Sequence, residues 1–129
     1  MSRVFLAVIF LPIDLISGCA KPDKVATFKS PVDGVFYTVE TYYAHTPVSD
    51  TTRVYAHFER NGKKAKMLVL EGSDLTVARI IWNSPRDVTF CIKSGDTNAF
   101  RNYVMLDIGD TPDDSITIHT DLQEHCDAR

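Results

Sequence analysis

Apolar and polar residues alternate along much of the chain after residue 34. The odd positions Val35, Tyr37, Val39 and Tyr43 are apolar, and Thr38 and Glu40 lie on the other side. The segment 52–59 repeats the pattern with apolar residues at positions 54, 56 and 58. A period of two is typical of a strand with one buried face. Both segments are therefore predicted to be strands whose apolar side chains face a core.

An Asn61-Gly62 pair follows the second of these strands. Asn and Gly readily adopt the positive φ angles of a tight hairpin turn, so the next apolar segment is predicted to pair back antiparallel. Clusters of Gly, Pro, Asn and Asp separate the candidate strands that follow, which are 67–70, 75–82, 88–92, 103–108 and 115–120.

These segments amount to about seven strands, and no segment carries a long helical stripe of apolar residues. Only residues 121–128 fit one or two helical turns, at the C-terminal end. The expected fold is all-β, a single antiparallel β-sandwich or small barrel with a short C-terminal helical turn.

Length and charge narrow the possible functions. The chain has 129 residues with 44% hydrophobic residues, which fits one globular domain. Fourteen Lys and Arg residues against 17 Asp and Glu residues give a net charge of −3. No overall positive field attracts nucleic acid, so no nucleic-acid partner is expected.

The N-terminal segment has the pattern of a bacterial export signal. Arg3 precedes an apolar run over residues 4–11 that is too short to span a membrane as a helix. The sequence Ile16-Ser17-Gly18-Cys19 follows, and it resembles the lipobox of bacterial lipoproteins: an aliphatic residue, two small residues and a cysteine. The alternative interpretation is a buried N-terminal strand that contains a cysteine.

The resemblance to bacterial lipoproteins implies a location and a modification. In that family a peptidase cuts before the cysteine, the sulfur carries diacylglycerol, and the new amino group is acylated, for example with palmitate. Carried over here, residues 1–18 are a signal peptide, Cys19 is the lipid attachment residue, 19–24 form a lipidated tether and 25–129 form one β-rich domain. Because Ala20 is not the Asp that resembles an inner-membrane retention signal, the expected location is the outer membrane, facing the periplasm. No family is assigned to the mature domain.

Lipid attachment at Cys19 leaves Cys91 and Cys126 in an oxidising compartment, where a disulfide between them is expected. Cys91 has the opposite parity to its apolar neighbours and is expected to face outward, with the bridge holding the C-terminal tail across the sheet. The alternative is two reduced thiols. His119, His125 and Cys126 lack the spacing of a known zinc motif, so no metal or other cofactor is expected.

The chain shows no nucleophile elbow, Cys-His signature or cofactor loop, so no catalytic residue and no enzymatic activity are expected. Outward-facing aromatic residues support a binding surface, since aromatic residues are common in protein interfaces. The candidate surface residues are Tyr42, Tyr55, His57, Glu59 and Trp82. We therefore expect a small lipid-anchored envelope protein that binds another protein, as an immunity protein or as an inhibitor of an envelope-acting enzyme. A solvated sheet face is the alternative for these residues.

Three further possibilities stay open at this point. A basic hairpin with Lys63, Lys64 and Lys66 suits an accessory protein that contacts peptidoglycan or an outer-membrane complex. A small hydrolase would need His57, or one of Glu40, Glu59 and Glu71, in a cleft with a perturbed pKa. The acidic segment 107–114 offers carboxylates to calcium or is a solvated loop.

Overall fold

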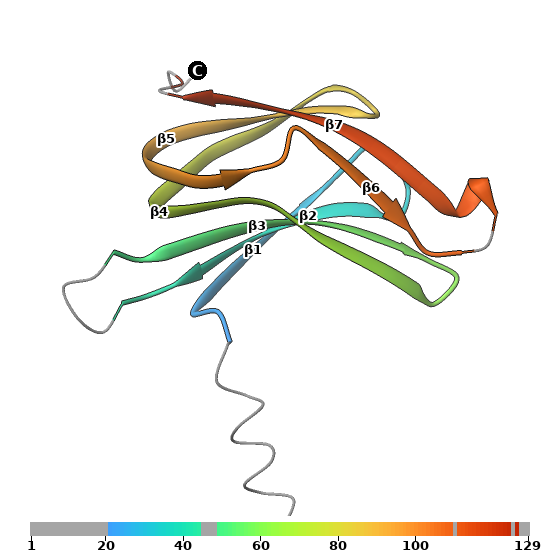
Figure 1. The fold of residues 1–129 in the computed structure, drawn as a ribbon, viewed down its shortest axis with the longest axis horizontal. Coiled ribbons are helices and arrows are strands. Elements are labelled where there is room, and N and C mark those ends of the chain that lie inside the picture. The colour runs from blue at the N-terminus through green and yellow to red at the C-terminus, as the bar shows by residue number, and fades with distance from the viewer. Residues whose placement is uncertain (1–20, 45–48, 110, 125, 127–129) are drawn as a thin grey trace, which may run out of the picture.

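The computed structural model of the chain describes residues 21–44, 49–109, 111–124 and 126. Seven strands form one sheet in the order β1-β2-β3-β4-β5-β7-β6 (Figure 1). Their bounds are β1 Lys24–Lys29, β2 Val35–Tyr42, β3 Thr51–Arg60, β4 Lys63–Ser84, β5 Asp87–Phe100, β6 Tyr103–Asp107 and β7 Ser115–Glu124, with a 3-10 turn at Pro112–Asp114. Among the described residues, no helix has the length and hydrophobicity needed to cross a membrane.

The prediction of an all-β fold with about seven strands is confirmed, with corrections to its details. The strand β7 lies between β5 and β6 and runs parallel to β5, so the sheet is mixed rather than purely antiparallel. The outer strands β1 and β6 do not pair with each other, and the sheet is not closed into a barrel. The expected C-terminal helical turn is wrong over residues 121–124, which belong to β7, and most of its remainder lies outside the described residues.

The predicted strands 67–70 and 75–82 are one continuous strand, β4. Between Glu71 and Thr76 its register with β5 shifts repeatedly, as bulges do. Asp74 has a φ of 50°, and a side chain at Gly72 would collide with Leu75 and with the backbone of β5. Bulges bend and twist a strand. The polar segment that resembles a turn in the sequence therefore bends a strand without ending it.

This bend folds the sheet over one core. In Figure 1 the strands β1, β2 and β3 lie on one side and β5, β6 and β7 on the other, with β4 curving between them. Five of the seven residues predicted to be inward, at positions 35, 37, 54, 56 and 58, are buried there. Val39 is only partly buried against the core, and the prediction is wrong for Tyr43, which lies after the end of β2 and is 50% exposed. The core residues are Val35, Tyr37, Val54, Ala56, Phe58, Val69, Leu70, Leu75, Val88, Phe90, Ile92, Val104, Leu106, Ile116 and Ile118.

Tyr37 joins the two sides of the folded sheet. It is fully buried, and its ring meets the ring of Phe90 edge-on at 5.2 Å and lies 5.4 Å from that of Trp82, between ring centroids. Because β2 and β5 are not neighbours in the sheet, the contact with Phe90 crosses the core. Burial raises the pKa of Tyr37, and the Thr120 hydroxyl of β7 opposes this increase in part.

The predicted disulfide between Cys91 and Cys126 is confirmed. Alternation along β5 places Cys91 on the face opposite to Phe90, as expected, but Cys91 is fully buried rather than exposed. The segment of Cys126 lies against β5, because its backbone N–H donates to the carbonyl of Ile92 at 3.3 Å. The two cysteines are 35 residues apart in the sequence, and a bridge that closes a loop of this length contributes about 4 kcal/mol to stability on the chain-entropy model.

Removing the ring contact between Tyr37 and Phe90 should destabilise the fold strongly. Phe90→Ala should lower the free energy of unfolding by about 3–5 kcal/mol, because it leaves a cavity beside Tyr37. Urea denaturation of the oxidised protein measures this loss. The control Met105→Ala, at an exposed position of β6, should change it by less than about 0.5 kcal/mol. Equal effects of the two substitutions would show that Phe90 does not hold the two sides together.

Candidate functional site

Polar and aromatic side chains gather on the outer face of β2, β3 and the first part of β4. The alternation that buries one face of these strands directs the other face away from the core. The strand register places four pairs of these side chains directly opposite each other. The pairs are Phe36 with His57, Thr38 with Tyr55, Glu40 with Arg53, and His57 with Lys66. We define the Glu40 surface as Phe36, Thr38, Glu40, Tyr42, Arg53, Tyr55, His57 and Lys66.

Glu40 is the centre of this surface, and it is only 8% exposed although it points away from the core. The Tyr42 hydroxyl donates to its Oε1 at 2.8 Å, and the Thr38 hydroxyl donates to its Oε2 at 3.4 Å. Lys66 Nζ lies 3.6 Å from the same Oε2. A carboxylate with so little water contact needs such partners. The network therefore holds Tyr42 and Lys66 in place around Glu40.

His57 extends this network along the sheet. Its Nε2 lies 2.8 Å from the Thr38 hydroxyl oxygen, and its ring stacks on Phe36 with centroids 4.5 Å apart. Burial lowers the pKa of His57, and the charge of Lys66 lowers it further. Both effects disfavour the protonated form of the imidazole.

Two cations cover the two tyrosine rings of the surface. Lys66 Nζ lies 4.1 Å from the ring centroid of Tyr55, and Arg53 Cζ lies 5.1 Å from that of Tyr42. Arg53 Nε is also held by Glu71 Oε2 at 2.7 Å. Cation–π contacts and ion pairs together restrict the rotamers of these long side chains. The aromatic and charged groups are thus arranged before any partner binds.

The structure brings together four of the five candidate surface residues. Tyr42, Tyr55 and His57 belong to the Glu40 surface. Glu59 lies at its border on the same strand as Tyr55, and it forms an ion pair with Lys64 at 3.7 Å.

The fifth candidate, Trp82, does not share this face. It packs partly buried against the core beside Tyr37. Its partner on β5 is the fully buried Val88, which shows that Trp82 points inward. The bulges between Val77 and Arg79 shift the parity of β4, so the position of Trp82 cannot be read from the alternation alone.

Sequence analysis missed the central residues of the surface. Alternation places Thr38, Glu40 and Arg53 on the outward side of predicted strands but does not show that they meet. Lys66 is predicted only as part of the basic hairpin. A usable signal was present, because counting back from the turn at 61–62 places Lys66 opposite His57. Pairing between the first two predicted strands would then have added Glu40.

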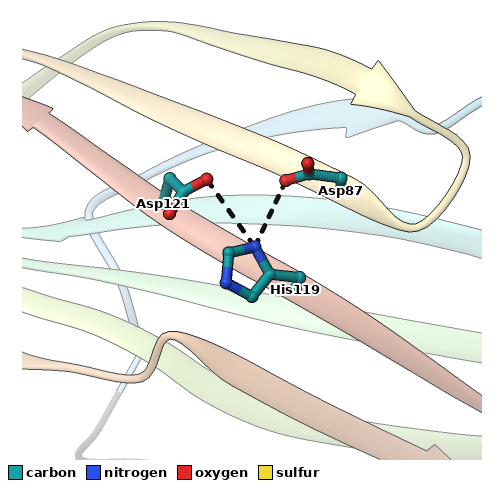
Figure 2. A group of neighbouring side chains, drawn as sticks. All are labelled: Asp87, His119 and Asp121. Carbon is teal, nitrogen blue, oxygen red and sulfur yellow. Dashed lines mark hydrogen bonds and ion pairs between the residues drawn. The ribbon is translucent and has the colours of Figure 1, made fainter.

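A second cluster lies on β5 and β7, where Asp87, His119 and Asp121 come together (Figure 2). His119 Nδ1 is 3.4 Å from Asp87 Oδ1 and 3.6 Å from Asp121 Oδ2. The parallel register puts Asp87 beside His119, and Asp121 is two residues further along the same face. Sequence analysis missed this cluster because alternation does not reveal which strands pair over a long sequence separation.

Two of the three residues considered as zinc ligands in the sequence, His119 and Cys126, have other partners in the structure. Cys126 is part of the disulfide and offers no free thiolate. His125 lies outside the described residues. His119 instead faces the two aspartates of β5 and β7.

Two carboxylates of the acidic segment 107–114 accept hydrogen bonds from groups within the same segment. Asp107 Oδ1 accepts the backbone N–H of Gly109 at 3.1 Å, and Asp114 Oδ2 accepts the Thr111 hydroxyl at 2.9 Å. Asp110 lies outside the described residues. These hydrogen bonds stabilise the turn before β7, and calcium binding stays a possibility that the sequence raised.

A cleft of about 480 Å³ opens on the inner side of β1 and β2, where the folded sheet is left open. Its apolar lining includes Phe28, Val39 and Leu75, and its charged lining includes Lys24 and Asp74. The cleft combines apolar and charged groups, and the hydrogen-bonded network of the Glu40 surface lies on the opposite face of β2.

The predicted signal peptide and the comparisons with known proteins add nothing further to the site. Residues 1–18 and the predicted lipid attachment residue Cys19 lie outside the described residues. No protein-family model matches the chain, and no curated protein or solved structure is significantly similar to it. Function is therefore inferred from the two clusters described above.

The electrostatics of the Glu40 surface predict a titration shift. Lys66→Met should raise the pKa of His57, because it removes a repelling cation and leaves Glu40 without its counter-charge. NMR titration of the imidazole resonances measures this pKa, which should lie below 6.5 in the wild-type protein. The control Lys93→Met, on β5, should leave it unchanged. A pKa that is the same in both variants would contradict the proposed network.

The same shift makes stability depend on pH. The pKa of His57 is lower in the folded state than the ordinary 6.5, so its contribution to stability is complete above about pH 6.5. This contribution is lost as the pH falls through the folded-state pKa, because the unfolded chain binds the proton more readily. His57→Gln should therefore lose less stability than the wild type on acidification, as measured by urea denaturation at several pH values.

Proposed function

We propose that this protein is a small, lipid-anchored protein of the bacterial cell envelope that binds another protein through the Glu40 surface. The observation that carries the proposal is the arrangement of Tyr42 and Tyr55, each covered by a cation, around the buried carboxylate of Glu40. Tyrosine and arginine are enriched among the residues that contribute most to protein–protein binding. The partner class we propose is an envelope-acting enzyme, with this protein as its inhibitor or immunity protein.

Rigidity of the surface supports binding of this kind. Fixing a flexible side chain on association costs about 0.5–1.5 kcal/mol. Arg53 is already held by Glu71, and Lys66 by Glu40. The contact groups also project from paired strands rather than from loops, which keeps their relative positions fixed. Little of the binding free energy is then lost in ordering them.

An enzymatic role has weaker support. In an activated nucleophile site the carboxylate orients the imidazole, and the imidazole contacts the hydroxyl. Here Glu40 contacts the Thr38 hydroxyl, and His57 contacts that same hydroxyl from its other side. The arrangement resembles a network that fixes a surface, so we propose a non-enzymatic function.

The accessory role based on the basic hairpin also has weaker support. Lys64 lies 3.7 Å from Glu59, and Lys66 lies 3.6 Å from Glu40. Both cations therefore act partly within the protein, which lowers the positive potential available to peptidoglycan or an outer-membrane complex.

The proposed location rests on the lipobox at residues 16–19 and agrees with the disulfide, since disulfides persist in oxidising compartments. Intact-mass analysis of protein purified from a bacterial membrane fraction tests it. The expected mass is that of residues 19–129 plus acyl groups, with two thiols that react only after reduction. Cys19→Ser should remain uncleaved and unacylated. A full-length mass with three free thiols in the wild type would overturn the envelope location.

Site-specific photo-crosslinking in cells tests the binding surface. A photoreactive phenylalanine analogue in place of Tyr55 should give one discrete adduct with another protein, and the same analogue in place of Tyr103 on β6 should not. Adding Arg53→Ala should weaken binding, and with it the yield of that adduct, by about thirtyfold, because truncating a central interface arginine costs about 2 kcal/mol. Adding Arg101→Ala, at an exposed arginine, should not lower it. The same adducts from positions 55 and 103 would rule out the Glu40 surface as the binding site.

A further inference from the structure

We propose that Asp87, His119 and Asp121 bind a divalent transition-metal ion, with Zn²⁺ as the best match. The cluster lies on β5 and β7, on other strands than the Glu40 surface, and the proposal does not depend on the proposed protein binding. Its three side chains offer one imidazole nitrogen and two carboxylate oxygens from two paired strands (Figure 2).

The separations between the donor atoms fit a tetrahedral ion. Two ligands at roughly 2.0–2.1 Å from Zn²⁺ lie roughly 3.4 Å apart in that geometry. The Nδ1 atom of His119 is 3.4 Å from Asp87 Oδ1 and 3.6 Å from Asp121 Oδ2. The two carboxylate oxygens lie within 4.8 Å of each other, and a small rotation of one exposed aspartate side chain closes this third edge.

The backbone around the cluster is held firmly. The N–H of His119 donates to the carbonyl of Arg86, next to Asp87, at 2.8 Å. The neighbouring Thr120 is fully buried, which fixes the face on which His119 and Asp121 point outward. The Cα positions of all three donors are therefore set by the sheet, as a preorganised metal site requires.

The charges of the cluster favour the binding of a divalent cation. Within the described part of the chain, His119 is the only side chain that pairs with Asp87 or Asp121. A single Nδ1–H cannot satisfy two carboxylates at once, whereas two carboxylates and a neutral imidazole balance a charge of +2. An imidazole nitrogen suits Zn²⁺ better than Ca²⁺ or Mg²⁺, which prefer oxygen ligands. With three protein ligands, a fourth position is left for water or another ligand.

Isothermal titration of the full chain with ZnSO₄, disulfide intact, tests the proposal. One equivalent should bind, and His119→Ala should weaken binding at least about tenfold, since even the loss of an outer-shell partner of a ligand costs that much. Asp121→Asn should also weaken it, and provides a second variant at an exposed position. The control His57→Ala should bind as the wild type does.

His125, which lies outside the described residues, supplies a further control. His125→Ala should leave the affinity unchanged if the ligands are those proposed, and X-ray absorption should show nitrogen and oxygen neighbours without sulfur. Affinity that is equal in wild type and in His119→Ala, or lost in His125→Ala alone, would overturn the assignment. Absence of Zn²⁺ binding would also overturn the proposal.

Discussion

A sheet of seven strands buries one of its own faces in this protein because β4 and β5 bend at the same place. On β4 the bend includes Gly72 and Asp74, and on β5 it includes Gly95, whose φ is 100°. A side chain at Gly95 would collide with the backbone of Asp74, so the two bends fit closely together. Only with this bend can Tyr37 of β2 reach Phe90 of β5 across the core. The other buried side chains fill the space that this contact encloses.

The same bend decides where the outward-facing groups lie. Strands β2, β3 and the first part of β4 present the Glu40 surface, and β5 and β7 present the cluster around His119. The disulfide from Cys91 to Cys126 holds residue 126 on the outer side of β5. Each candidate site is therefore built on paired strands of one part of the folded sheet, and a substitution in one should leave the other unchanged.

The features that could be predicted from the sequence depend mainly on residues that lie close together along the chain. Alternation identified the inward faces of β2 and β3, Asn61-Gly62 identified their hairpin to β4, and the cysteine count identified the disulfide. The sequence could not predict the bend, because the polar residues of 71–74 suit a turn and a bulge equally well. It also could not predict the position of Trp82, which depends on bulges, or the parallel pairing of β5 and β7. Both depend on contacts between distant segments.

The carboxylates of the two sites differ in how fully the protein satisfies them. Glu40 accepts from Tyr42 and Thr38 and pairs with Lys66, so both of its oxygens have partners and its effect is to hold other groups in place. Asp87 and Asp121 share one imidazole nitrogen, and within the described residues no other side chain pairs with them. An ionised carboxylate has about four acceptor sites, so the two half-exposed aspartates that share one nitrogen retain acceptor sites for an external cation. This difference supports a protein-binding role for the first site and a metal-binding role for the second.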